Sequence, residues 1–293
     1  MSAPHHHDSE LILNPDGSIY HLALHRDQVA QTIMLVGDPE RVPLISERFD
    51  SIEHRVMKRE FHTHTGRVGS TRLTVISTGI GTDNIDIVMT ELDALFNVDP
   101  VSRTQSLTPQ RLDFIRLGTS GGLQPECLPG TLLASSYGLG LDGLMHYYKR
   151  TESAGVRNLT KAFTDYIASK SVKLPIAPYF GQADPDLLTM YSSGLMAGIT
   201  LTAPGFYGPQ GRHIRLQPWR EDILDILSGF GTSQMKLTNI EMETSAIYAM
   251  ATTLGHRALS LNALLANRPT KSFSPNPRAV VTSLIDHFLS HFS

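Results

Sequence analysis

Cysteine is almost absent from this 293-residue sequence, in which Cys127 is the only one. A single thiol excludes an internal disulfide framework and a zinc site built from several cysteines. An excess of one charge sign is also missing, because 25 Lys and Arg residues face 28 Asp and Glu residues, for a net charge of −3. This balance argues against a protein that binds nucleic acid through a basic surface.

Long apolar runs are missing as well. No uninterrupted apolar stretch approaches the length of about 18 residues that a membrane span requires. The first ten residues are polar and have no apolar signal core. With 41% hydrophobic and 18% charged residues, the composition is that of a folded chain with a sizeable core. We therefore expect a globular protein of the cytoplasm, with no membrane partner.

Short apolar runs alternate with amphipathic stretches along most of the chain. This pattern predicts strands at 32–36, 72–77, 113–117, 131–135 and 258–266, and helices at 83–96, 156–170, 219–230, 243–254 and 278–292. Such alternation favours a layered α/β fold. We expect residues 1–18 to form a disordered tail, residues 19–293 to form one domain, and the polar segment 99–111 to be an inserted loop.

Three of the predicted strands end in glycine, at Gly37, Gly79 and Gly118. In open α/β sheets, ligands bind at the carboxyl ends of the strands, and glycine lets backbone N–H groups approach an anion. Arg41 follows the first of these glycines, and Arg116 precedes the third. Arginine suits bidentate contacts with phosphate oxygens. Each feature alone also fits a plain turn or a core arginine paired with an acid, but two such sites together favour a phosphate.

Residues 138–143 match the pattern GxGxxG, which can bind a dinucleotide when a helix follows directly. No helical stripe follows here, so we predict a glycine-rich loop instead.

Other polar residues suit a sugar and a base. Glu243 could accept hydrogen bonds from two neighbouring hydroxyls, and Met242 could pack against a sugar face. Gln210 and Arg212 could read the imide edge of a heterocycle, with Phe206 stacking on it. The alternatives are an acid-rich helix start and an ordinary surface loop.

At this point the sequence resembles a known family. Seven segments occur in the order found in the uridine phosphorylase branch of the nucleoside phosphorylases: GDPER at 37–41, KREF at 58–61, STGIG at 77–81, RLGTSG at 116–121, FYGPQGR at 206–212, EMET at 241–244 and NR at 267–268. The resemblance extends from about residue 20 to the C-terminus.

The resemblance implies a three-layer α/β/α sandwich around a twisted, barrel-like mixed sheet. It also implies a pentosyltransferase that carries out reversible phosphorolysis of uridine or a related pyrimidine nucleoside, giving free base and ribose 1-phosphate. Inorganic phosphate is then a co-substrate, no other cofactor is expected, and the assembly is a homodimer or a homohexamer of three dimers. The alternatives are a related phosphorylase or nucleosidase with another base preference, and a catalytically silent nucleoside-binding subunit.

The motifs also carry residue roles. The resemblance assigns phosphate to Gly37, Arg41, Arg116 and Thr119, and to Arg59 from a neighbouring subunit. It assigns ribose to Met242 and Glu243, and the ribose 5′-hydroxyl to His21 across the same interface. It assigns the base to Phe206, Gln210, Arg212 and Arg268. Of these residues, Arg116, Gln210 and Arg212 are expected to carry catalysis.

The chain departs from the family pattern at three places. Thr202-Ala203-Pro204 stands where the family usually has serine-serine-aspartate. At a subunit-interface site for a monovalent cation such as K⁺, Glu60 and Ile80 match, but Asn84 replaces a serine. The segment 99–111 is longer than in the familiar members of the family. Asn267, by contrast, fits the pattern of the pyrimidine branch: the purine branch has an aspartate there, so Asn267 favours a pyrimidine.

Overall fold

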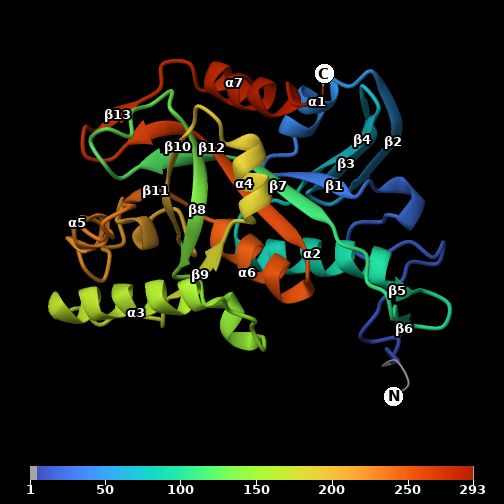
Figure 1. Ribbon diagram of the computed structural model, residues 1–293, viewed down its shortest axis with the longest axis horizontal. Helices are drawn as coiled ribbons and strands as arrows, with labels where there is room; N and C mark the ends of the chain where they lie inside the picture. Colours follow the sequence, from blue (N-terminus) through green and yellow to red (C-terminus); the bar gives the residue numbers. More distant parts are fainter. Residues whose placement is uncertain (1–4, 293) are drawn as a thin grey trace.

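The computed structural model describes residues 5–292. Five paired strands form a closed ring, and Figure 1 shows them in the middle of the molecule. They are β7 (Asp113–Gly122), β8 (Leu132–Gly140), β10 (Met196–Thr202), β11 (Leu237–Glu241) and β12 (Arg257–Asn267). The ring closes because β12 pairs with both β7 and β8, while β10 and β11 complete the path between them. Strand β12 is a nearly continuous apolar run, as expected for a strand that is covered on both faces.

The sheet extends outward from β7 through a second group of strands. In spatial order these are β1 (Thr32–Val36), β4 (Thr71–Ser77), β3 (Phe61–Val68) and β2 (Ser51–Lys58). Strand β9 (Tyr179–Gln182) pairs with β8, and β13 (Ser272–Phe273) pairs with β12. Because β1 runs parallel to both β4 and β7, the carboxyl ends of these three strands meet at one edge.

Helices cover the sheet on both sides. Figure 1 shows α1 (Arg41–Ser46) and α7 (Pro277–Leu289) along one side, with α2 (Thr82–Asn97), α3 (Ala154–Ser169) and α6 (Thr244–Leu254) along the other. The shorter helices are α4 (Pro185–Tyr191) and α5 (Ile223–Ser228). Helix α2 buries one stripe, which includes Ile85, Val88 and Leu92, as its period of 3.6 residues predicts. This arrangement confirms the predicted α/β/α sandwich with a barrel-like mixed sheet.

Several predicted elements have different bounds in the structure. The loop predicted for 138–143 is confirmed only for residues 141–143, because residues 138–140 belong to β8. A Cβ atom at Gly138 would lie 2.8 Å from the backbone of Ser245, and one at Gly140 would lie 2.4 Å from the ring of Tyr179. These glycines therefore allow close packing and do not form a phosphate loop. The predicted helix at 219–230 is reduced to α5.

The N-terminal segment differs from the expected tail. Residues 1–4 lie outside the described part of the chain, but the side chain of Leu11 packs into the core. The Arg103 guanidinium donates to the carbonyl of Leu11 at 2.6 Å and pairs with Asp8 at 3.0 Å. Arg103 lies in the segment 99–111, which was predicted to be an inserted loop. In the structure it lies between β5 (Val98–Asp99) and β6 (Thr104–Gln105), which pair as a hairpin. The apolar contacts of Leu11 thus hold the N-terminal segment against the core, although its polar composition predicted disorder.

Candidate functional site

A cavity of about 700 Å³ lies at the carboxyl ends of β1, β4, β7 and β11. Nine of the predicted site residues line it: Gly37, Arg41, Arg116, Thr119, Phe206, Gln210, Arg212, Met242 and Glu243. The structure therefore brings together the predicted phosphate, ribose and base residues from four separate parts of the chain. Among residues 5–292, no three His, Cys, Asp or Glu side chains cluster in a way that could hold a metal ion.

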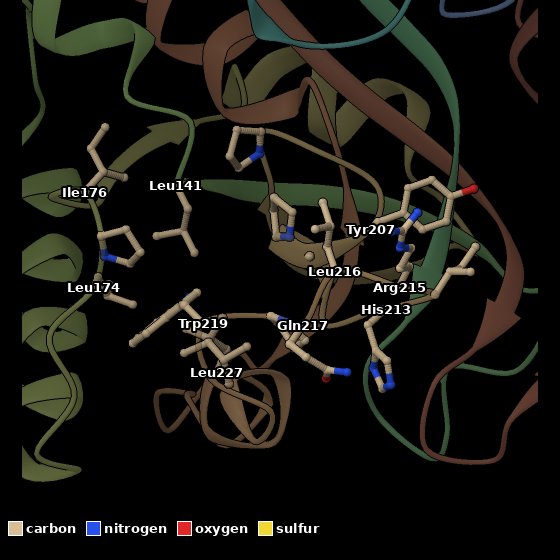
Figure 2. Close-up of a pocket in the computed structure, with 17 residues that line it drawn as sticks. Leu141, Leu174, Ile176, Tyr207, His213, Arg215, Leu216, Gln217, Trp219 and Leu227 are labelled. Atoms are coloured by element: carbon tan, nitrogen blue, oxygen red, sulfur yellow. The ribbon is translucent and has the colours of Figure 1, made fainter.

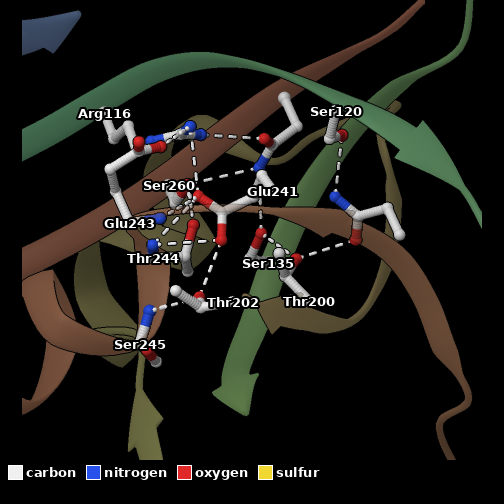
Figure 3. Close-up of polar contacts among 12 residues, drawn as sticks. Arg116, Ser120, Ser135, Thr200, Thr202, Glu241, Glu243, Thr244, Ser245 and Ser260 are labelled. Carbon is white, nitrogen blue, oxygen red and sulfur yellow. Dashed lines mark hydrogen bonds and ion pairs between the residues drawn. The ribbon is translucent and has the colours of Figure 1, made fainter. Parts of the chain in front are cut away.

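The Arg116 guanidinium belongs to a buried polar network beside this cavity (Figure 3). It donates to Glu243 at 2.6 Å and to the amide oxygen of Asn262 at 2.9 Å, and it lies 3.1 Å from Glu241. Burial opposes its charge, but the two carboxylates raise the pKa of Arg116. Arg116 is therefore a buried, paired arginine, and its pairing places a fixed positive group beside Glu243.

Glu241 also belongs to this network, although no role was predicted for it. Its carboxylate accepts hydrogen bonds from the Thr202 hydroxyl at 2.7 Å and from the backbone N–H groups of Glu243 and Thr244, each at 2.9 Å. These bonds hold the turn that leads into α6 (Figure 3). Glu243 in turn accepts a hydrogen bond at 2.8 Å from the backbone N–H of Gly81, and burial raises its pKa. The two acids of the EMET motif, which Met242 separates, could have signalled that both carboxylates lie near Arg116.

Gly118 contributes in a way that differs from the sequence interpretation. Arg116 and Gly118 are two residues apart on β7, so they face the same side of the strand. A Cβ atom at Gly118 would lie 1.7 Å from Nη1 of Arg116. The glycine therefore makes room for the guanidinium, whereas its place at the end of a strand predicted contacts with an anion.

The turn after β1 supplies the second arginine of the site. Asp38 accepts a hydrogen bond from the backbone N–H of Glu40 at 2.9 Å, and α1 starts at Arg41. The Arg41 guanidinium donates to the carbonyl of Leu117 at 3.2 Å. Burial, and then the charge of Arg116, lower the pKa of Arg41. An anion bound next to Arg41 would favour its charged form and so oppose the lowering of its pKa.

The loop after β10 forms the opposite wall of the cavity. The Arg212 guanidinium donates to Gln210 Oε1 at 2.5 Å and to the Phe206 carbonyl at 2.8 Å, and its Cζ lies 3.9 Å from the centre of the Phe206 ring. Burial and the neighbouring charge of Arg268 lower the pKa of Arg212 to about 10. Arg268 does not line the cavity, but it donates to the Gln210 carbonyl at 3.2 Å and so supports the loop from behind.

The same loop borders a second cavity of about 640 Å³ (Figure 2). Tyr207 faces this space, together with Leu216 and Trp219 from the chain that follows. The loop that carries the predicted base-binding residues thus has one face on each cavity.

Two predicted site residues lie away from the cavity of their own chain. Arg59 is exposed at the turn between β2 and β3, with a positive φ of 54°. The ring of His21 contacts Glu91 on α2. The expected roles of both residues involve the site of a neighbouring subunit, and one chain alone cannot complete such a site.

Comparison with known proteins identifies the family. The profile of the phosphorylase superfamily matches residues 31–279. The chain belongs to the phosphorylase superfamily. It is 31% identical over 263 residues to a uridine phosphorylase of Thermococcus kodakarensis, covering 88% of this chain and 80% of the relative. It is 27% identical over 266 residues to a uridine phosphorylase of Haemophilus influenzae, covering 89% and 91%.

A solved structure gives the same result for the fold. A nucleoside phosphorylase of Trypanosoma brucei, described as having uridine phosphorylase activity, superposes with a TM-score of 0.85 and 27% identity. The match covers 97% of this chain and 99% of that chain. The described part of this superfamily member has no helix that is long and apolar enough to cross a bilayer.

Proposed function

We propose that this chain catalyses the reversible phosphorolysis of uridine or a closely related pyrimidine nucleoside, yielding the free base and ribose 1-phosphate. The observation that carries the proposal is the single cavity of about 700 Å³, in which two arginines, a buried glutamate and an amide–guanidinium pair converge. The relatives named above support the choice of uridine. A nucleosidase has little use for two arginines in its site, because its nucleophile is water.

Phosphate would bind against Gly37, Arg41, Arg116 and Thr119, with Arg59 added from the partner subunit. As the bond between C1′ and the base nitrogen stretches, C1′ gains positive character and the bonding electron pair moves onto the base. The clamped phosphate stabilises this charge, and one of its oxygens then bonds to C1′. No covalent intermediate with the protein is needed, because positioning and electrostatic stabilisation carry the step.

The other residues would hold the two halves of the nucleoside. Glu243, fixed by Arg116 and the N–H of Gly81, would accept hydrogen bonds from the ribose hydroxyls, while Met242 packs on the sugar. Gln210 and Arg212 bond to each other in this structure. On binding, they would turn to the carbonyl and imide groups of the base and stabilise its negative charge, with Phe206 stacking on the ring.

Asn267 supports a pyrimidine rather than a purine. Its amide donates to the carbonyls of Gln124 and Cys127, each at 2.8 Å, and its oxygen accepts from the N–H of Thr270. These bonds use both the amide nitrogen and the oxygen of the Asn267 side chain. According to the resemblance, the purine branch has an aspartate at this position. The altered segment at 202–204 has a role of its own, because Thr202 holds Glu241.

The assembly we propose is a homodimer or a homohexamer, because Arg59 and His21 lie away from the cavity of their own chain and would act from a neighbouring subunit. The location we propose is the cytoplasm, which fits a metabolic enzyme. A monovalent cation such as K⁺ fits the donor chemistry near Glu60, Ile80 and Asn84, which line one wall of the cavity. The amide oxygen of Asn84 is an oxygen donor like the serine hydroxyl that it replaces.

The decisive experiment follows uracil release from uridine by the purified protein, with and without inorganic phosphate, together with an assay for ribose 1-phosphate. We expect release that requires phosphate and yields the sugar phosphate in equal amount. Release without phosphate would identify a nucleosidase and refute the proposal. Absence of release from uridine, with turnover of purine or thymine nucleosides instead, would refute the proposed base preference.

A further inference from the structure

Glu91 on α2 makes a set of contacts with a segment 70 residues earlier in the chain. One carboxylate oxygen lies 2.6 Å from Nδ1 of His21. The backbone N–H of His21 donates to both carboxylate oxygens at 3.0 Å, and the N–H of Leu22 donates to one of them at 3.0 Å. One side chain thus binds the backbone of residues 21–22 and the ring of His21 at the same time.

This geometry fixes which ring nitrogen of His21 carries the proton. A carboxylate that receives two backbone N–H groups acts as an acceptor, so the bond at 2.6 Å requires a proton on Nδ1. In the neutral ring, Nε2 is then left with a lone pair. The ring is also held by the edge of Tyr20, with the two ring centres 4.8 Å apart.

The location of the pair indicates where the free nitrogen is used. The Glu91 side chain is only 13% exposed, whereas that of His21 is 30% exposed. His21 does not line the cavity of its own chain. The ring is therefore a fixed acceptor at the surface, available to a group outside its own subunit.

We propose that Glu91 is a positioning residue, which orients His21 and holds it in the Nδ1–H form so that Nε2 accepts a hydrogen bond from the 5′-hydroxyl of a nucleoside in the partner subunit's site. This inference rests on the proposed function and deepens it. Glu91 touches no substrate atom, and it acts only through the ring of His21. It follows that the contribution of Glu91 to binding exists only for substrates that carry a 5′-hydroxyl.

The test compares uridine with 5′-deoxyuridine for the wild-type protein and for Glu91→Gln, which keeps the size of the side chain. We expect KM for uridine to rise roughly tenfold, the effect of losing about one hydrogen bond, with kcat little changed. For 5′-deoxyuridine we expect KM within twofold of the wild type. Glu47→Gln, an exposed substitution on another element, is the matched control and should change neither substrate.

A second experiment, in the His21→Ala protein, distinguishes a positioning role of Glu91 from a general structural role. In a His21→Ala protein, Glu91→Gln should add no further loss, because the residue through which it acts is gone. An equal loss on both substrates, a further loss in the His21→Ala background, or no loss on uridine would each overturn the proposal. A wild type that releases no uracil from either nucleoside would instead refute the proposed function, and the inference with it.

A spectroscopic measurement keeps the inference testable if Glu91→Gln does not fold. Long-range ¹H–¹⁵N correlation spectra of the histidine-labelled wild type, with the His21 signals assigned by comparison with His21→Ala, report the tautomer directly. We expect the proton on Nδ1. A proton on Nε2 of the neutral ring would overturn the proposal.

Discussion

Gly118→Ala is the smallest change that should dismantle the site. The added Cβ would lie 1.7 Å from Nη1 of Arg116 and 2.3 Å from its Cζ. Non-bonded carbon and nitrogen atoms rest about 3.5 Å apart, so the guanidinium must move by roughly 1.8 Å. A shift of that size is incompatible with the bonds of 2.6 Å to Glu243 and 2.9 Å to Asn262.

The energetic consequence follows from burial. Removing one partner of a buried ion pair costs about 3–5 kcal/mol, because the remaining charge loses its compensation. Arg116 stays nearby in this variant, so we expect a loss near the lower end, about 3 kcal/mol in the free energy of unfolding. We also expect kcat/KM for uridine and phosphate to fall at least a hundredfold, because the displaced guanidinium affects both the phosphate and the ribose side of the cavity.

Urea unfolding and steady-state kinetics at varied phosphate measure the two effects separately. Gly155→Ala is the matched control, because a Cβ there would approach its nearest neighbours no closer than 3.7 Å. It should leave both stability and turnover close to wild type. If Gly118→Ala keeps the stability and the kcat/KM of the wild type within twofold, then the pairing of Arg116 is not what organises this site.

The other predictions concern the base loop, acid stability and assembly. Arg212→Ala should lower kcat on uridine roughly a hundredfold with an unchanged circular dichroism spectrum; unchanged turnover would remove Arg212 from the mechanism. Burial lowers the pKa of His64 to about 4, so the unfolded chain binds a proton at a higher pH than the folded chain does. The free energy of unfolding should therefore decrease as the pH drops from 6.5 to 4, by at most about 1.4 kcal/mol per pH unit. In urea titrations, His64→Gln should flatten this slope, and an equal slope would contradict the assignment. Mixing inactive Arg59→Met and Glu243→Gln proteins should restore activity through hybrid sites, whereas a fully active monomer in sedimentation would exclude any role across subunits.

The elements of the fold were predictable where their pattern is local. The buried stripe of α2 and the apolar run of β12 follow from side-chain periodicity, which depends on neighbouring residues alone. The hairpin of β2 and β3 was not predicted, because β2 is largely exposed and β3, although mostly buried, consists largely of polar residues. Gly138 and Gly140 indicated a loop, yet they lie in β8, because the atoms that exclude a Cβ belong to distant segments.

The sequence by itself determined the residue types of the site and their order along the chain, since turn glycines, strand arginines and paired acids are local signals. Only the tertiary structure decided which of them meet. Arg116 pairs with Glu243 and His21 with Glu91 because the ring of strands and the packing of α2 bring together residues 127 and 70 positions apart. A linear pattern contains no information about such distances, because they depend on how the strands are ordered and closed in the sheet.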